Sequence, residues 1–123
     1  MTKKRVHVTV DRPIGSRHPE HGDLIYEVNY GYVPGVIGGD GEEQDAYILG
    51  LDKPINEFDG ELIATIIRND DNETKWVVAP EDMYFTDEEI LSLVHFQERY
   101  FDITIFRNEK KSIKNSNIQR KTN

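Results

Sequence analysis

Cysteine is absent from the chain, and so are long apolar runs. Without cysteine there is no disulfide framework and no thiolate site for zinc or for an iron–sulfur cluster. No apolar segment approaches the length needed to cross a membrane, and the N-terminal stretch MTKKRVHVTVDR lacks the apolar core of a signal peptide. We therefore expect a cytoplasmic protein without a membrane partner.

Basic side chains are also fewer than acidic ones. The 123 residues include 23 acidic and 15 basic side chains, which gives a formal net charge of -8. Proteins that bind duplex nucleic acid are usually basic, so nucleic acid is not expected as a partner. The length suits one modest core, and we expect a single domain over residues 1–108. Residues 109–123 are basic and almost free of apolar side chains, which predicts a disordered tail.

The pattern of apolar residues predicts a mostly β chain. Alternation predicts a strand over residues 4–10, and β-branched runs predict buried strands at residues 45–52 and 61–68. The turn residues 69–74 connect the latter to a further run, giving a hairpin over residues 61–79. Residues 102–107, with the sequence DITIFR, predict a further short strand. Together these elements predict an α+β fold, a small OB-like five-stranded β-barrel with one main C-terminal helix packed on it.

That helix has a clear start signal. Thr86 is followed three residues later by Glu89, which is the capping-box pattern, and Phe85 and Ile90 are placed for a hydrophobic staple. Asp87, in the first turn, suits the positive end of the helix dipole. Apolar residues then recur at helical spacing, so the helix is predicted to run to about residue 100.

Two acidic groups interrupt the predicted strands. Carboxylate oxygens are the ligands that Mg²⁺, Mn²⁺ and Ca²⁺ prefer, although each group taken alone is more often a solvated turn. An EF-hand is excluded because the sixth position from Asp40 is Asp45 rather than glycine. Two acidic groups with scattered Tyr, Arg and Lys are typical of a multi-metal phosphoryl-transfer site. The carboxylates are Asp40, Glu42 and Asp45 in the first group, and Asp70, Asp71 and Glu73 in the second.

A third feature is the stretch RPIGSRHPEHGD at residues 12–23, which is rich in proline, glycine and histidine. Its composition predicts a long ordered loop. Long loops inside compact domains are more often functional than idle, although surface decoration is the alternative. The loop brings Arg17, His18 and His21 between Arg12 and Tyr26.

The segment VNYGYVPGVIGGDGEEQDAYILG resembles the core signature of the soluble, Mg²⁺-dependent inorganic pyrophosphatases of the β-barrel family. In that family a Y-x-x-x-Y-G-[FY] segment leads into D-G-D-P-x-D-V. The "DR" at residues 11–12 resembles the end of the preceding family strand, and NDDNETKWVVAP resembles the later acidic hairpin with its lysine. HFQERYFDI resembles the family's helix end, H-F-F-x-x-Y-K-x-L. The order is kept from about residue 5 to 106, and the matching positions include Tyr26, Tyr30, Gly31, Tyr32, Asp40, Gly41, Glu42 and Asp45.

The resemblance implies divalent-metal-dependent hydrolysis of inorganic diphosphate to two phosphates. The cofactor would be Mg²⁺, with Mn²⁺ as the alternative, and the bacterial members of the family suggest a homo-oligomer. Glu42 and Asp45 would be catalytic, with Glu42 as the base for the nucleophilic water. The metal ligands would be Asp40, Glu42, Asp45 and Asp70, with Asp71 and Glu73 at or near the metals. The substrate-binding residues would be Arg12, Tyr30, Lys75 and Tyr100, with Tyr26 close by.

The chain departs from the family pattern in several places. Glu42 stands where the family has aspartate, and Glu43 where it has proline. The lysine and glutamates of the family's earlier strands have no counterpart, and Phe101 replaces the lysine after the helix tyrosine. Two phosphate-binding cations are thus missing, and Arg17 is predicted to replace them because guanidinium stays charged and binds phosphate in a forked geometry.

Two alternatives to the diphosphatase stay open. One is a hydrolase of another phosphoanhydride, such as a nucleotide diphosphate linkage, with the loop at residues 12–23 reshaping the pocket. The other is a non-catalytic relative that binds metal or phosphate.

Overall fold

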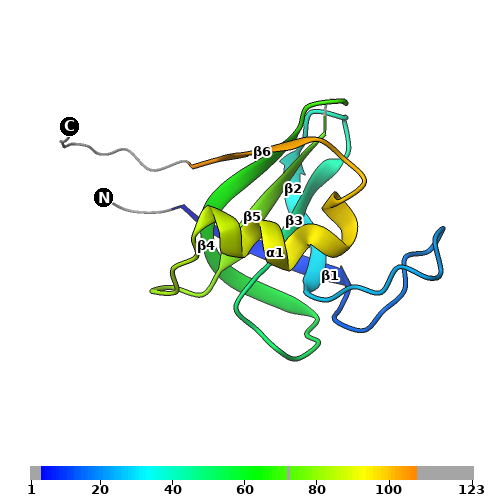
Figure 1. Cartoon of the computed structure of the whole chain (residues 1–123). Helices are drawn as coiled ribbons and strands as arrows, with labels where there is room; N and C mark the ends of the chain where they lie inside the picture. The colour runs from blue at the N-terminus through cyan, green and yellow to red at the C-terminus, as the bar shows by residue number, and fades with distance from the viewer. Residues whose placement is uncertain (1–3, 72, 108–123) are drawn as a thin grey trace.

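The computed structural model describes residues 4–71 and 73–107, so the tail predicted for residues 109–123 lies outside the described residues. Within them the chain forms six strands and one helix (Figure 1). The elements are β1 (Arg5–Arg12), β2 (Asn29–Ile37), β3 (Glu43–Ile48), β4 (Glu57–Arg68), β5 (Thr74–Ala79), α1 (Asp87–Glu98) and β6 (Ile103–Phe106).

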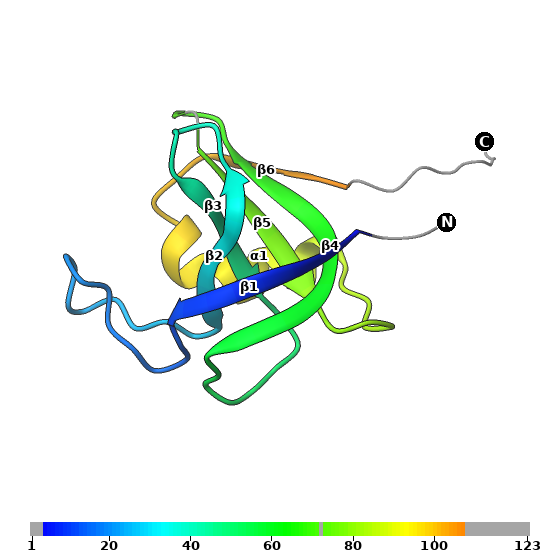
Figure 2. The same cartoon turned by 180° about the vertical axis from the view of Figure 1, so that it is seen from behind.

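Five of the strands close into a barrel. The sheet order is β1-β2-β3-β5-β4-β6, and β1 pairs with β4 as well as with β2. Figure 2 shows how β1 crosses the back of the molecule between β2 and the long, bent β4. The barrel is mixed because β3 and β5 are parallel while the other pairs are antiparallel. The predicted five-stranded barrel with one helix is therefore confirmed, and β6 is an additional strand on the outer side of β4.

The barrel wall is buried on both faces. One apolar cluster draws on all five barrel strands and fills the interior, with Val8, Ile48 and Val78 as members. A second cluster lies between the wall and α1, and it contains the neighbouring residues Tyr47 and Val77. Side chains alternate faces along a strand, so a strand buried on both faces carries a continuous apolar run. This is why residues 46–49 and 77–79 show no polar alternation.

Helix α1 packs one face on the barrel and begins where the sequence predicts. Ile90 and Val94 are fully buried against the wall, and burial of each such side chain contributes roughly 1.5–3 kcal/mol. Thr86 Oγ1 accepts from the backbone N–H of Glu89 at 3.1 Å, and the Glu89 carboxylate accepts from Thr86 N–H at 2.8 Å. The capping box is thus confirmed, while the helix ends at Glu98, earlier than predicted. Within the described residues, no helix is long and apolar enough to span a membrane.

We expect Thr86→Ala to lower the free energy of unfolding by about 1 kcal/mol, because one N-terminal N–H of α1 loses its side-chain acceptor. Denaturant unfolding measures the change. Ser92→Ala is the matched control, because Ser92 lies exposed on the same helix away from the cap. Equal stability of Thr86→Ala and wild type would show that the cap contributes nothing to the folded state.

The other elements follow the predictions with shifted ends. The predicted strand at residues 4–10 extends to Arg12, and the hairpin over residues 61–79 is present with Glu61 opposite Ala79. Gly31 allows β1 and β2 to approach closely, since a Cβ there would lie 1.9 Å from the Thr9 carbonyl oxygen. The chain leaving β1 forms the predicted loop, which projects beside the end of α1 (Figure 1).

Candidate active site

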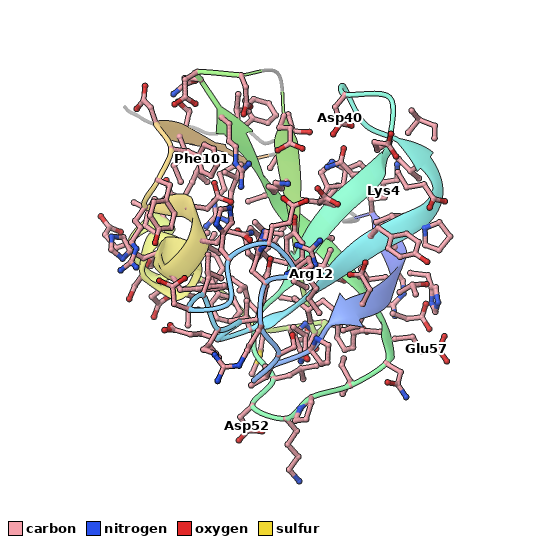
Figure 3. All side chains as sticks on the ribbon, turned by 90° about the vertical axis from the view of Figure 1, so that its right-hand side faces the viewer. Lys4, Arg12, Asp40, Asp52, Glu57 and Phe101 are labelled. Carbon is pink, nitrogen blue, oxygen red and sulfur yellow. The ribbon has the colours of Figure 1, made fainter. Side chains whose placement is uncertain are left out.

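A cavity of about 540 Å³ lies where the end of β1, the following loop and the end of α1 meet. The strands contribute its charged wall, and Glu73 adds to it just before β5. In Figure 3, Arg12 lies near the centre of the view, below both Phe101, on the α1 side, and Asp40, on the hairpin of β2 and β3. The strand residues that line the cavity are Asp11, Arg12, Tyr30, Asp45, Arg68 and Lys75.

Lys75 is the centre of the charged wall. The parallel pairing of β3 and β5 sets it directly beside Asp45. Its Nζ lies 2.6 Å from Asp45 Oδ2 and 3.3 Å from Glu73 Oε1, and it donates to the Tyr30 hydroxyl at 3.0 Å. The side chain is almost fully buried, at 4% exposed. Burial of an ammonium is costly unless it is paired, and here Lys75 lies between two carboxylates at the cavity wall.

Arg12 supplies a second cation at the cavity. Its guanidinium donates to the Tyr26 hydroxyl at 2.8 Å and lies over the rings of Tyr26 and Tyr30, 5.7 Å from each centroid. Asp11, beside it, also lines the cavity. Desolvation raises the pKa of the Asp11 carboxyl, and the charge of Asp45 adds to this while Arg12 opposes it. The wall therefore contains a carboxyl that is a better proton acceptor than an ordinary aspartate.

A chain of buried hydrogen bonds joins this cation to the helix. The Tyr26 hydroxyl donates to the Gln97 amide oxygen at 2.6 Å, and the Gln97 amide nitrogen donates to the Tyr47 hydroxyl at 2.6 Å. Tyr47 in turn donates to the Glu98 carboxylate at 2.6 Å. Burial, together with Glu98, raises the pKa of Tyr47 far above its usual value, so it stays a donor. The last turn of α1 therefore orients Arg12 through Tyr26.

Arg68 continues the chain on the other side of Glu98. Its guanidinium donates to both Glu98 oxygens, at 3.0 and 2.8 Å, and to Glu73 at 2.8 Å. Its carbon centre lies 3.6 Å from the centroid of the Phe101 ring. Burial opposes the charge, but the hydrogen bonds and charge of Glu98 more than offset it and raise the pKa of Arg68. Arg68 thereby fixes the Glu73 carboxylate that also contacts Lys75.

The structure brings half of the predicted site residues to one cavity. These are Arg12, Tyr30, Asp45, Glu73, Lys75 and Tyr100. The other six do not line it. They are Arg17, Tyr26, Asp40, Glu42, Asp70 and Asp71.

The first acidic group divides at a tight turn. Asp40 and Glu42 are exposed in this turn, where Asp40 accepts from the Glu42 N–H at 3.0 Å and Gly41 has a φ of 86°. That hydrogen bond and a side-chain contact with Glu73 lower the pKa of Asp40. Asp40 therefore lies near the charged wall although it does not line the cavity, while Asp45 reaches the wall from within β3.

Asp71, from the second acidic group, and Arg17 each form a hydrogen bond within their own turn or loop. Asp70 and Asp71 are exposed in the turn between β4 and β5, and Asp71 accepts from the Glu73 N–H at 2.9 Å. Arg17 donates to the Gly22 carbonyl at 2.6 Å within its own loop. Tyr26 is fully buried, and its hydroxyl contacts the cavity-lining residues Arg12 and Gln97. The predicted roles of these residues in metal and substrate binding stay predictions.

Sequence reasoning overlooked Arg68, Gln97 and Glu98. A charged residue closing the apolar run ELIATIIR was the available signal for Arg68. Gln97 and Glu98 adjoin buried positions on α1, but nothing in a helical pattern separates a buried amide and carboxylate from a solvated helix end. All three are at most 6% exposed.

Whether a divalent metal fits depends on the carboxylates. Among residues 4–71 and 73–107, no three or more histidine, aspartate or glutamate side chains lie close enough to form a ready metal site. Mg²⁺, however, usually binds through one or two carboxylates together with substrate phosphates and water. The Asp45 and Glu73 carboxylates share one ammonium and face one cavity. This donor set suits Mg²⁺ that arrives with a phosphate-containing ligand.

Comparison with known proteins gives a likeness in fold. The chain superimposes on the inorganic pyrophosphatase from Ehrlichia chaffeensis with a TM-score of 0.62 and 19% identity, over 81% of this chain and 83% of that one. For the inorganic pyrophosphatase from Helicobacter pylori the TM-score is 0.62 with 14% identity, over 88% and 89% of the two chains. For the inorganic phosphatase from Anaplasma phagocytophilum the TM-score is 0.59 with 18% identity, over 84% of this chain and 82% of that one.

The chain therefore has the fold of these bacterial inorganic pyrophosphatases, and the resemblance noted in the sequence is confirmed at the level of the barrel. No protein-family model and no curated protein matches the chain. At such low identity the likeness establishes the fold, and the activity has to be argued from the cavity.

Proposed function

We propose that this protein hydrolyses inorganic diphosphate to two phosphates with the help of a divalent metal. The observation that carries the proposal is the cavity that combines the cations Arg12 and Lys75 with the carboxylates Asp45 and Glu73. Cations bind and neutralise phosphate oxygens, and carboxylates hold metal ions and accept protons. The pyrophosphatase fold supports the same activity. A single domain over residues 1–108 and a homo-oligomer belong to the proposal.

In this proposal the protein's own cations bind the substrate. Lys75 and Arg12 contact phosphate oxygens, and the Tyr30 hydroxyl, already held by Lys75, orients them. Asp45 and Glu73, with Asp40, would hold Mg²⁺, which would polarise the phosphoryl group and neutralise its charge. Tyr100, which lines the cavity and is 59% exposed, contacts the outer phosphate.

One carboxylate has to take the proton of the attacking water. Of the two predicted catalytic residues, Asp45 lines the cavity and Glu42 lies in the exposed turn after Gly41. We assign the proton to Asp45 or to its neighbour Asp11, whose raised pKa suits a base. Glu42 serves this role if its long side chain turns toward the wall beside Asp40.

The test is release of phosphate from diphosphate with and without Mg²⁺ or Mn²⁺. We expect metal-dependent release by the wild type, and a fall in kcat/KM of at least about tenfold in Asp45→Asn. Mg²⁺ with methylene diphosphonate should raise the melting temperature of the wild type more than that of the variant, because the site exists only in the folded state.

Asp52→Asn is the matched control, because Asp52 is exposed and does not line the cavity (Figure 3). It should behave as wild type in both measurements. The proposal fails if the wild type releases no phosphate from diphosphate with either metal.

A further inference from the structure

The cavity has a second end that the hydrolysis of inorganic diphosphate leaves unused. Besides the charged wall, the loop after β1 contributes His18, His21, Asp23 and Leu24 to the lining. A volume of about 540 Å³ lies within the range of pockets that enclose ligands of drug size, whereas inorganic diphosphate is far smaller. The cavity as a whole therefore has room for an organic group attached to the diphosphate.

The loop that forms this end is held in place by its own backbone. Gly15 N–H donates to the Tyr26 carbonyl at 2.8 Å and Tyr26 N–H to the Ser16 carbonyl at 2.9 Å. His18 N–H donates to the Leu24 carbonyl at 2.9 Å, so the two arms of the loop are paired. A binding surface that is already ordered loses little conformational entropy when a ligand arrives.

His18 presents an aromatic face at this end. Its ring is 6.3 Å from the Tyr26 ring at an interplanar angle of 12°, and 4.9 Å from the His21 ring. Its Nδ1 accepts from the Glu20 N–H at 3.0 Å, which requires that nitrogen to be unprotonated. Partial burial, Arg12 and His21 lower the pKa of His18, so the ring is neutral at neutral pH. A neutral ring suits stacking better than it suits charge pairing with phosphate.

The other groups at this end fit a sugar and a base rather than a further phosphate. Asp23 is an exposed carboxylate that repels phosphate but accepts hydrogen bonds from hydroxyl groups. Leu24 adds an apolar surface, and its backbone pairs with that of His18. The cavity is thus cationic at one end and aromatic with a hydroxyl acceptor at the other.

From this division we infer that the cavity binds nucleoside diphosphates, with the diphosphate between Arg12 and Lys75, the ribose hydroxyls near Asp23 and the base against His18. The inference rests on the proposed function for its chemistry and on the second end of the cavity for its specificity. Water adds to the terminal phosphorus and the anhydride P–O bond breaks. The nucleoside monophosphate leaves with the bridging oxygen, and the proton of the water passes to a wall carboxylate.

The experiment compares two stable ligands by calorimetry in the presence of Mg²⁺. One is adenosine 5′-(α,β-methylene)diphosphate and the other is methylene diphosphonate, which lacks the nucleoside. We expect the wild type to bind the nucleoside ligand at least tenfold more tightly. His18→Ala should reduce this preference roughly 5- to 150-fold, the range expected from one base–aromatic stack. Asp23→Ala should also reduce it, without removing an aromatic ring.

His7→Ala is the matched control, because His7 pairs with Asp59 and Glu57 and does not line the cavity. It should keep the wild-type preference. Equal affinity of the wild type for the two ligands would overturn the inference, as would a preference that survives both His18→Ala and Asp23→Ala. Phosphate release from inorganic diphosphate is measured separately, so failure of the proposed hydrolysis is distinguishable from failure of the nucleoside subsite.

Discussion

Replacing Lys75 with methionine is expected to lower kcat for diphosphate hydrolysis by roughly 10²- to 10³-fold, the usual cost of removing one preorganised group that stabilises transition-state charge. Methionine keeps most of the volume of the side chain and removes the ammonium. The Asp45 and Glu73 carboxylates then face the cavity without the cation that lies 2.6 and 3.3 Å from them. Glu73 keeps its pair with Arg68, but Asp45 loses its cation and repels the phosphates.

Steady-state kinetics beside a thermal melt measures this effect. Lys53→Met is the control, because Lys53 is exposed in the connection between β3 and β4. It should retain wild-type kinetics. If Lys75→Met also retains them, the ammonium at the centre of the charged wall takes no part in the reaction, and the proposed function loses its main support.

Replacing Arg68 with methionine is expected to lower the free energy of unfolding by about 3–5 kcal/mol, the cost of breaking a buried ion pair by removing one partner. Glu98 is only 2% exposed and accepts two hydrogen bonds from Arg68. Without Arg68 this carboxylate is buried with the Tyr47 hydroxyl as its remaining side-chain donor in the described part of the chain.

A double variant separates charge from packing. Arg68→Met with Glu98→Gln should recover part of the lost stability, because the neutral amide costs less to bury than a carboxylate. Arg5→Met is the control, since Arg5 forms an exposed pair with Glu81 at 3.8 Å that is expected to contribute at most about 1 kcal/mol. Denaturant unfolding is the measurement. A loss in Arg68→Met no greater than that in Arg5→Met would show that the network around Glu98 does not stabilise the fold.

The helix start shows what local sequence can predict well. The capping box joins Thr86 and Glu89, three residues apart, so the contact depends on nothing beyond one turn of chain. The helix end is less local. The pattern predicted residue 100, but α1 ends at Glu98, where the carboxylate is drawn into the network with Tyr47 and Arg68.

The acidic groups show where prediction from sequence ends. Spacing alone placed Asp40, Glu42 and Asp45 together, yet only Asp45 lines the cavity. Side chains of a strand point to fixed faces, so Asp45 is directed by the register of β3, whereas the residues of a tight turn are free of that constraint. The same reason separates Glu73, next to β5, from Asp70 and Asp71.

The sequence by itself determined the barrel, its helix and several residues of its charged wall, among them Arg12, Asp45 and Lys75, because strand burial, capping and motif order depend on short stretches of chain. Only the tertiary structure decided which side chains meet. Lys75 reaches Asp45 through the parallel pairing of β3 with β5, across 30 residues of chain. Arg68 reaches Glu98 across another 30. Such contacts arise from the closure of the barrel and the docking of α1, which place buried charges beside partners that no local pattern specifies.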